Sequence, residues 1–332
     1  MVIHVLVQVQ ATVLGKSGGG CCMKAVVYER YGSPDVLHLK DIPKPSPAEG
    51  EVLIKIYATT VTIGDIRMRS FTVPLLQWPF ARLYLGVFAP RRRILGMELA
   101  GKIEALGTGV TQFKAGDSVF ASTFEENFGG YAEYKCMKEA GLVALKPSAL
   151  TFEEAAAAVG GGITALRCLR QAHIQPGQQV LIYGASGAVG SNAVQLAHSY
   201  YGAEVTAVCS AGNQEWVSEL GAARVIDYAR EDFALNGPVY DVVFDAVAKY
   251  PPRRAKHALK EQGAYLNVHR DSGGDKRQPM REDLHNIKAL IEAGTLKPVI
   301  DRCYPLEAVV EAHQYVDKGH KKGNVAITVV QA

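Results

Sequence analysis

The sequence predicts a two-domain α/β protein, in which a barrel-like β domain precedes a doubly wound parallel sheet. Short β-type runs bounded by Gly, Pro and Asp fill residues 23–149. From about residue 150, strand-like runs alternate with helix-like runs, which is the order that parallel strands with crossover helices require. A turn with three regularly spaced glycines lies between the first of these strands and its helix, at residues 184–190.

Composition and charge exclude several classes of protein. The chain has 332 residues, 48% hydrophobic and 21% charged, which is ordinary for a globular protein with two cores. Its formal net charge of +3 is too small to indicate a nucleic-acid partner. The six cysteines form no CxxC pair and no zinc spacing, so we expect reduced thiols and a cytoplasmic protein. Apolar runs are far shorter than the roughly 20 residues that a membrane helix needs.

Two local features stand apart from the main pattern. Residues 1–22 alternate like a strand and then resemble a Gly-rich linker, and they lack the positive start of a signal peptide. We interpret them as an appendage outside the main fold, because Met23 opens a run typical of a protein start. The basic residues 91–93 are interpreted as a solvated surface turn, with an anion or membrane site as the alternative.

The β domain is predicted over residues 23–149, and regularly spaced short strands of this kind indicate a barrel. Its expected strands cover residues 24–29, 50–59, 99–107, 116–122 and 131–137.

The parallel-sheet domain is predicted over residues 150–294. Its first helix is expected over residues 151–172, with Thr151 as N-cap and Glu154 completing a capping box. The strands expected after it are residues 179–184, 204–210, 224–228, 241–247 and 264–268, and the helices are residues 189–202, 213–221 and 253–263. Residues 295–332 return to β-type runs around a helix at 307–319, and we expect this tail to rejoin the first domain.

The glycine turn predicts a dinucleotide site. Gly184 allows a tight exit from the strand, Gly187 lets the backbone approach a phosphate, and Gly190 lets the helix pack on the sheet. The first turn of the helix then presents free N–H groups to a pyrophosphate. The spacing is GxxGxxG rather than the usual GxGxxG. The residues predicted to bind the cofactor here are Gly184, Ala185, Ser186, Gly187, Ala188, Val189 and Gly190.

The end of the next strand indicates NADPH rather than NADH. An NAD site usually places Asp or Glu there to bind the ribose hydroxyls. Here the strand ends without a carboxylate, and Ser210 and Asn213 can donate hydrogen bonds to a 2′-phosphate. No Lys or Arg lies in this loop, and Ser210 can also be read as a plain helix N-cap.

Several motifs together resemble the medium-chain dehydrogenase/reductase superfamily, specifically its zinc-free, quinone-oxidoreductase-like branch. The resemblance covers residues 23–330. Its carriers are GMELAGKIEALGTGVTQFKAGDSVFA (96–121), GGYAEY (129–134), GGGITAL (160–166), GASGAVG (184–190), GAARVIDY (221–228) and HKKGNVAITV (320–329). The resemblance implies a GroES-like β domain completed by the C-terminal tail, a Rossmann domain, and a nicotinamide cleft between them.

The resemblance also implies that no zinc is bound. Zinc-dependent relatives carry a His-Glu pair where this chain has Met97 and Glu98, and they carry a cysteine run that is missing here. A thioether is a poor zinc ligand. Without a Lewis acid, hydride donation to an electron-poor acceptor is easier than reversible alcohol oxidation.

Further site residues are carried over from the family by position. Thr62, where many relatives have Asn, and Asp65 are expected to face the nicotinamide and the substrate, and are our candidates for catalysis. The remaining cofactor-binding candidates are Thr164, Tyr228, Ala246, Val247, Asn267, Gly323 and Asn324, of which Thr164 can equally be an ordinary helix hydroxyl.

Two segments depart from the family pattern. Residues 71–96 are long, aromatic and apolar, and are interpreted as an active-site lid, an interfacial patch or a buried structural loop. Residues 269–285 are polar where relatives have a further strand, so we expect the sixth strand of the Rossmann sheet to be missing or shortened and the loop to be mobile. Because that strand commonly builds the family's dimer, we expect a monomer or a dimer built on another surface.

These observations lead to one principal functional hypothesis. The protein is predicted to transfer hydride from NADPH to a small electrophilic substrate, a quinone or an α,β-unsaturated carbonyl, without a metal. The alternatives are a carbonyl or alcohol oxidoreductase, and a non-catalytic cofactor-binding adaptor that associates with a membrane surface through residues 71–96.

Overall fold

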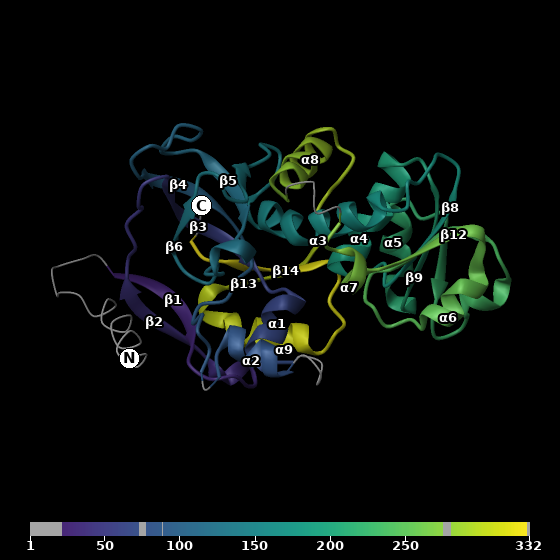
Figure 1. The fold of residues 1–332 in the computed structure, drawn as a ribbon, viewed down its shortest axis with the longest axis horizontal. Helices are drawn as coiled ribbons and strands as arrows, with labels where there is room; N and C mark the ends of the chain where they lie inside the picture. Colours follow the sequence, from purple (N-terminus) through teal and green to yellow (C-terminus); the bar gives the residue numbers. More distant parts are fainter. Residues whose placement is uncertain (1–21, 73–77, 88, 275–279, 331–332) are drawn as a thin grey trace, which may run out of the picture.

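The computed structural model describes residues 22–72, 78–87, 89–274 and 280–330, so the predicted appendage (residues 1–22) lies almost wholly outside the described residues. The two domains lie side by side along the long axis of the molecule (Figure 1). One is built on antiparallel strands and the other on a parallel sheet, which confirms the predicted fold class.

The β domain is a seven-stranded sheet with a separate hairpin. Along the sheet the strand order is β13-β14-β3-β4-β5-β7, and β6 pairs with β3. Strands predicted by alternation are present, while β2 and β7 were not predicted. The elements contributed by the first half of the chain are β1 (Cys22–Tyr28), β2 (Leu37–Pro43), β3 (Glu51–Thr60), α1 (Ile63–Ser70), α2 (Trp78–Leu85), β4 (Glu98–Leu106), β5 (Ser118–Ser122), β6 (Tyr134–Lys138) and β7 (Val143–Leu145).

The C-terminal tail completes this sheet, as the resemblance implied. Strand β14 (Asn324–Thr328) pairs antiparallel with β3, and β13 (Ile300–Pro305) lies parallel to β14. Helix α9 (Val309–Asp317), which connects them, packs against α1. The β domain is therefore built from segments that lie before and after the Rossmann domain in the sequence.

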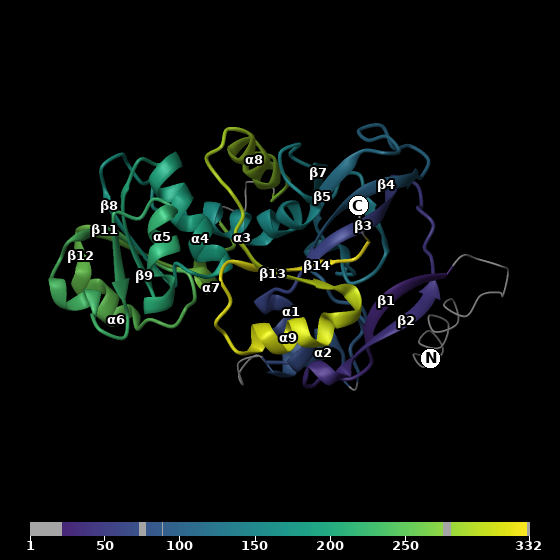
Figure 2. The same ribbon diagram turned by 180° about the vertical axis from the view of Figure 1, so that it is seen from behind.

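The Rossmann sheet has five parallel strands in the order β10-β9-β8-β11-β12 (Figure 2). The helices α4 and α5 connect the first strands, and a π-helical turn (Leu196–Tyr200) extends α4. The bounds are β8 (Gln179–Tyr183), α4 (Ala188–Gln195), β9 (Glu204–Cys209), α5 (Gln214–Glu219), β10 (Arg224–Asp227), β11 (Tyr240–Asp245), α6 (Pro252–Ala255) and β12 (Leu259–Asn267).

No sixth strand follows β12 in the residues that the structure describes. Helix α7 (Val268–Asp271) begins directly after it, and α8 (Met280–Glu292) follows residues 275–279, which are outside the described part. Part of the predicted polar loop is therefore helical. The Rossmann sheet ends at β12, as the sequence predicted.

The helix predicted over residues 253–263 is wrong for residues 259–263, which belong to a strand. Helix α6 and a 3-10 turn end at Ala258, and β12 already begins at Leu259. Leu259 pairs with Tyr240 of β11, and the register shifts before Ala264 pairs with Val242. Pairing to the neighbouring strand overrides the helical propensity of these residues, and the local sequence does not show it.

Helix α3 (Phe152–Arg170) connects the two domains. The predicted capping box is present, since Thr151 accepts from the Glu154 N–H at 3.2 Å and Glu154 accepts from the Thr151 N–H at 2.9 Å. The helix contacts strands β3, β4 and β14 of the β domain and helices α4 and α8 on its other sides.

Three consecutive glycines in the middle of α3 allow this close packing. A Cβ at Gly160 would lie 1.9 Å from Glu98 Oε1, and a Cβ at Gly161 would lie 2.7 Å from the Ala188 carbonyl oxygen. A Cβ at Gly162 would meet only the end of the Ile287 side chain, at 3.1 Å. Glycine inside a helix costs about 1 kcal/mol relative to alanine, and here close approach of other elements requires it.

Buried charge fixes the carboxyl end of α3 to α8. Asp283 is fully buried and accepts from Arg167 and from Arg170, each at 2.7 Å. A buried carboxylate needs such partners, because an unpaired charge in the interior is strongly destabilising.

The glycine run gives a test of the α3 packing. Gly161→Ala is expected to lower the free energy of unfolding by about 2 kcal/mol, because the backbone of α4 cannot move aside without separating the two helices. Gly162→Ala is the matched control. It is expected to change stability by less than about 1 kcal/mol, since Ile287 can shift and helix propensity improves. Urea unfolding measures both, and equal losses in the two variants would contradict the packing argument.

Candidate functional site

The glycine turn lies at the carboxyl edge of the Rossmann sheet. The N–H groups of Gly184 and Ala185 donate to the Val208 carbonyl at 3.0 Å, which joins the turn to β9. Gly184 has a φ of 79°, a conformation that favours glycine. Helix α4 starts immediately after Gly187, which as N-cap provides no side-chain hydrogen bond. The first N–H groups of α4 are therefore available to an anion.

Gly187 and Gly190 have different roles in this turn. A Cβ at Gly190 would lie 2.1 Å from the Gly184 carbonyl oxygen, so Gly190 allows the helix to pack on the strand. At Gly187 the nearest atom would be 3.5 Å away, so this position is open. The Gly323 N–H donates to the Ser186 carbonyl at 2.8 Å, which places the C-terminal tail directly against the turn. The structure thus brings Gly323 and the glycine turn together.

The expected 2′-phosphate residues lie at the ends of β9 and β10. Asn213 donates to Ser210 Oγ at 2.9 Å, and the Tyr228 N–H donates to the Cys209 carbonyl at 3.2 Å. The exposed Arg230 follows on the same side, 3.6 Å from Asp227. The sequence analysis considered only the loop after β9 as the source of a cation. It missed Arg230, which follows the neighbouring strand β10.

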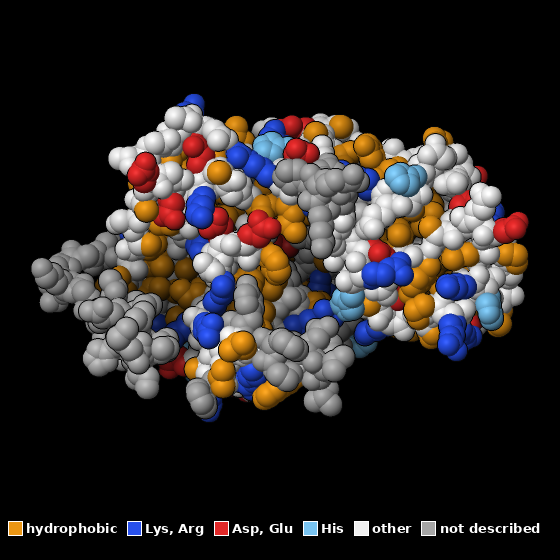
Figure 3. Space-filling model, viewed as in Figure 1, with side chains coloured by type: hydrophobic (Ala, Val, Ile, Leu, Met, Phe, Trp, Pro, Cys, Tyr) orange, Lys and Arg blue, Asp and Glu red, His pale blue; other side chains and the backbone are white. Residues whose placement is uncertain are grey.

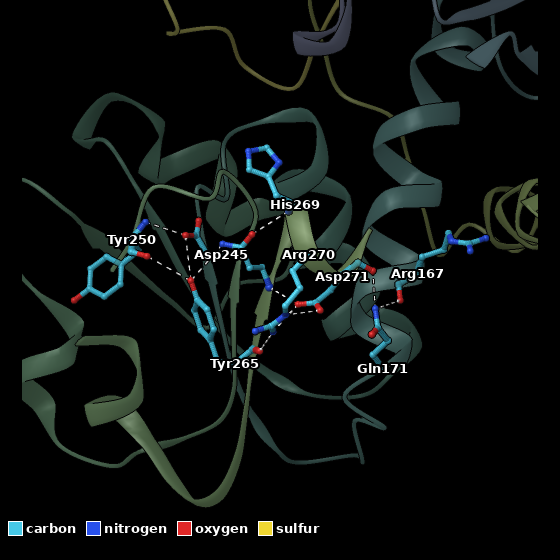
Figure 4. A network of polar contacts seen from close by, with 9 residues as sticks. Arg167, Gln171, Asp245, Tyr250, Tyr265, His269, Arg270 and Asp271 are labelled. Carbon is cyan, nitrogen blue, oxygen red and sulfur yellow. Dashed lines mark hydrogen bonds and ion pairs between the residues drawn. The ribbon is translucent and has the colours of Figure 1, made fainter. Parts of the chain in front are cut away.

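A network of polar contacts holds the ends of β11 and β12 (Figure 4). The buried Asp245 carboxylate accepts from the Val247 N–H at 3.1 Å and from the Tyr250 N–H at 2.8 Å. Asn267 caps α7 by accepting from the His269 N–H at 2.9 Å. The strand ends that carry Ala246, Val247 and Asn267 are therefore rigidly placed at the same edge of the sheet as the glycine turn.

The network continues from α7 to α3 (Figure 4). Asp271 is paired with Arg270 at 2.8 Å and accepts from the Asn267 N–H at 2.6 Å. Gln171, at the end of α3, donates to the Asp271 carbonyl at 2.6 Å. These contacts connect the edge of the sheet to the helix between the two domains.

One side-chain contact spans the two domains beside this edge. The His269 ring projects away from the other labelled side chains (Figure 4) and lies 3.1 Å from an Arg67 nitrogen of α1. Because a guanidinium only donates, the His269 Nε2 accepts and its Nδ1 carries the proton. Burial and the charge of Arg67 both lower the pKa of His269, so the ring is neutral at neutral pH.

Thr62 and Asp65 form the amino-terminal cap of α1. Thr62 Oγ1 accepts from the Asp65 N–H at 3.1 Å, and the Asp65 carboxylate accepts from the Thr62 N–H at 2.9 Å. Its second oxygen accepts from the Gly96 N–H at 2.9 Å. Asp65 is completely buried, and burial raises the pKa of its carboxyl to about 6 despite these hydrogen bonds. This geometry gives Asp65 a positioning role, and contact of either residue with a substrate stays a prediction.

Thr164 and Asn324, which the family resemblance also predicted to bind the cofactor, lie in different environments. Thr164 is half-buried in α3, four residues after the close contact of Gly160 with Glu98. The Asn324 side chain donates to the Val299 carbonyl at 3.1 Å, so its amide is engaged within the tail.

Sequence analysis missed a pair of interacting ionisable groups, the buried Glu98 and the half-buried Lys321. The Glu98 carboxylate accepts from Thr60 Oγ1 and from the Gly160 N–H, and burial raises its pKa to about 7. Lys321 donates to the Gly323 carbonyl, and burial lowers its pKa to about 8, against the opposing attraction of Glu98. Both groups therefore exchange protons near neutral pH, which is typical of functional sites. The sequence offered one signal for this pair, because Glu98 follows Met97 at the position where zinc-dependent relatives have a His-Glu pair.

The residues around Glu98 do not fit a zinc ion. Met97 offers only a thioether, whose sulfur lies 3.6 Å from Thr62 Oγ1, and the Glu98 carboxylate is engaged by protein donors. Within the described ranges, no group of three or more His, Cys, Asp or Glu side chains could hold a metal ion. Independence from metal nevertheless stays a prediction.

Comparison with known proteins places these features in a family. Residues 48–147 match the model of the alcohol dehydrogenase GroES-like domain, and residues 220–327 match a zinc-binding dehydrogenase model. The chain is 34% identical to tomato (Solanum lycopersicum) 2-methylene-furan-3-one reductase and 32% identical to an Arabidopsis thaliana chloroplastic NADPH-dependent alkenal/one oxidoreductase. Each alignment covers 92% of this chain and 79% of the relative.

A solved structure supports the same assignment. The quinone oxidoreductase of Coxiella burnetii superposes with a TM-score of 0.81 at 30% identity, covering 93% of this chain and all of that one. None of the described helices is long and apolar enough to cross a bilayer. Since one relative is named as chloroplastic, the cytoplasmic location stays a prediction.

Thr62 can be tested through the titration of Asp65. Thr62→Val is expected to lower the free energy of unfolding by about 1 kcal/mol, because a helix cap is lost. The Thr62 hydroxyl also donates to the Asp65 carboxylate at 2.6 Å and so favours its ionised form, and without this hydrogen bond the pKa of Asp65 should rise above about 6. A raised carboxyl pKa makes stability fall as pH increases toward that pKa, so the variant should lose more stability at pH 8 than at pH 5.

Thr62→Ser is the control, because it keeps the hydroxyl. Urea unfolding at both pH values should leave it close to the parent protein. An equal loss at pH 5 and pH 8 in Thr62→Val would contradict the proposed link to Asp65.

Gly187 tests the cofactor assignment. Gly187→Asp is expected to weaken NADPH binding at least about 100-fold, since a carboxylate would face the phosphates at the start of α4. The position has room and an ordinary φ of −83°, so the fold should survive, as circular dichroism can check. Gly187→Ala adds bulk without charge and should bind better than Gly187→Asp. Unchanged affinity of Gly187→Asp in calorimetry would remove the assignment.

Proposed function

Because the chain belongs to the medium-chain dehydrogenase/reductase superfamily, in its quinone-oxidoreductase-like branch, and is an oxidoreductase, we propose that it transfers hydride from NADPH to a quinone or an α,β-unsaturated carbonyl without a metal. The observation that carries this proposal is the open glycine turn at the carboxyl edge of the Rossmann sheet, with the tail from the other domain against it. A nicotinamide dinucleotide bound there supplies the hydride.

The residues at the ends of β9 and β10 favour NADPH. Ser210 and Asn213 offer hydrogen-bond donors, and Arg230 offers a positive charge at an exposed position. These are the groups that a 2′-phosphate requires, whereas a carboxylate at the end of β9 would repel it. The name of the Arabidopsis relative, an NADPH-dependent enzyme, agrees with this preference.

The electrostatics around Glu98 favour an acceptor that is already electron-poor. Alcohol oxidation in this superfamily needs a Lewis acid to stabilise an alkoxide, and the residues here do not fit zinc. Reduction of an enone adds a hydride to the β-carbon and a proton to the resulting enolate. Glu98 and Lys321, with pKa values of about 7 and 8, can hold that proton near neutral pH.

The remaining residues position the cleft. Asp65 fixes Thr62 and Gly96 on the β-domain side, while Asp245 and Asn267 fix the strand ends on the Rossmann side. The contact between Arg67 and His269 connects these two sides. Orientation of the two reactants is the main contribution expected from such a site.

A panel of acceptors tests the proposal. Purified protein with NADPH should reduce quinones and enones with a kcat/KM at least about 100-fold higher than for alcohol oxidation with NADP⁺, and EDTA treatment should not change the rate. Alcohol oxidation that disappears on chelation would support the alcohol-oxidoreductase alternative instead. Tight NADPH binding without turnover on any acceptor would support the non-catalytic adaptor.

A further inference from the structure

A second recess lies in the β domain, at the end of the molecule opposite the Rossmann sheet. It encloses about 390 Å³ between β1, β6 and the segments 91–94 and 127–129. Figure 3 shows a hollow with hydrophobic side chains at its base and Lys and Arg side chains beside it, over the region where Figure 1 places β1 and β6. Its lining shares no residue with the candidate cofactor site.

The charged groups of this recess are all positive. Arg91, Arg93 and Lys135 line it, and its lining contains no Asp or Glu. Within the described part of the chain, none of the three forms an ion pair. The charge of Arg93 acts on the Glu29 carboxylate, which is already paired with Lys40 at 2.9 Å.

Lys135 is the most deeply placed of these cations. Its ammonium group donates to the main-chain carbonyl of Glu126 at 2.8 Å, and burial lowers its pKa. The carboxylates of Glu126 and Glu51 act on it only from outside the lining. A desolvated ammonium group without an anion in contact is unfavourable, and a bound anion would stabilise it.

The backbone beside Lys135 is held in an unusual conformation. Asn127, Phe128 and Gly129 have consecutive positive φ values of 66°, 62° and 107°. Such values are uncommon for a bulky residue like Phe128, and strain of this kind gathers at binding sites. The turn leaves space for Lys135, since a Cβ at Gly129 would lie 3.1 Å from its Cδ.

Apart from Asn127, the rest of the lining is mostly apolar. Met23 and Phe128 are buried, and Ile94 and Tyr134 are half-buried beside them. We propose that this recess binds a small organic anion, whose carboxylate or phosphate lies among Arg91, Arg93 and Lys135 and whose apolar body packs against these four side chains. Arginine pairs suit such oxyanions because their N–H groups can donate in a bidentate manner.

Calorimetry with the NADPH-saturated full-length protein tests the proposal. Octanoate and octyl phosphate are the anionic probes, octanol is the apolar control, and inorganic phosphate is the charged control. At least one anionic probe is expected to bind at least about tenfold more tightly than either control, because the recess contacts both its anionic group and its alkyl chain. Saturation with NADPH should leave this affinity unchanged, since the two sites are separate.

Charge-removing variants locate the site. Arg91→Gln/Arg93→Gln and Lys135→Gln should each weaken the binding of the anionic probes at least about tenfold while NADPH affinity is retained. The double variant Arg253→Gln/Lys256→Gln, in the Rossmann domain, removes two exposed positive charges elsewhere and should bind these probes like the parent protein.

Three results would overturn the proposal. One is equal binding of octanol and the anionic probes. Another is binding of these probes that survives both recess variants or is displaced by NADPH. The last is binding only to vesicles of anionic phospholipid and not to monomeric probes, which would indicate a membrane-facing surface.

Discussion

The glycine run of α3 is the constraint on which the arrangement of the two domains depends. At Gly160 and Gly161 the helix backbone contacts Glu98 on one side and Ala188 on the other. A side chain at Gly160 would separate α3 from the β domain, and one at Gly161 would separate α3 from α4. Glu98 can be buried against α3, and α4 can begin beside α3, because residues 160 and 161 have no side chains.

Desolvation then determines the chemistry of the cleft. Asp65, Glu98 and Lys321 are all removed from water, and each pKa moves toward neutrality because the charged form loses hydration. A metal ion would have reversed this effect for the carboxylates by stabilising their charge. Without the donor set for a metal ion, these three groups keep pKa values near neutral, which suits the proposed reduction of polarised double bonds.

Features encoded by neighbouring residues could be predicted from the sequence. The capping box of Thr151 and Glu154, the glycine turn and most of the alternating strands depend on local spacing, and the structure shows them where expected. Features that depend on pairing between distant segments were missed. Strand β12 begins early because Leu259 meets Tyr240, and Arg230, Lys321 and His269 reach the site from strands and loops that only the fold brings together.

The return of the tail has a consequence for the order of folding. Strand β3, near the start of the chain, pairs with β14, which is synthesised only near the end, and β14 lies beside the glycine turn through Gly323. The domain encoded first is thus completed last, after the Rossmann sheet has been synthesised in full. Until then the residues Ala58–Thr60 at the end of β3 have an unpaired edge in the growing chain, so the nascent protein depends on β14 to protect this edge against pairing with other chains.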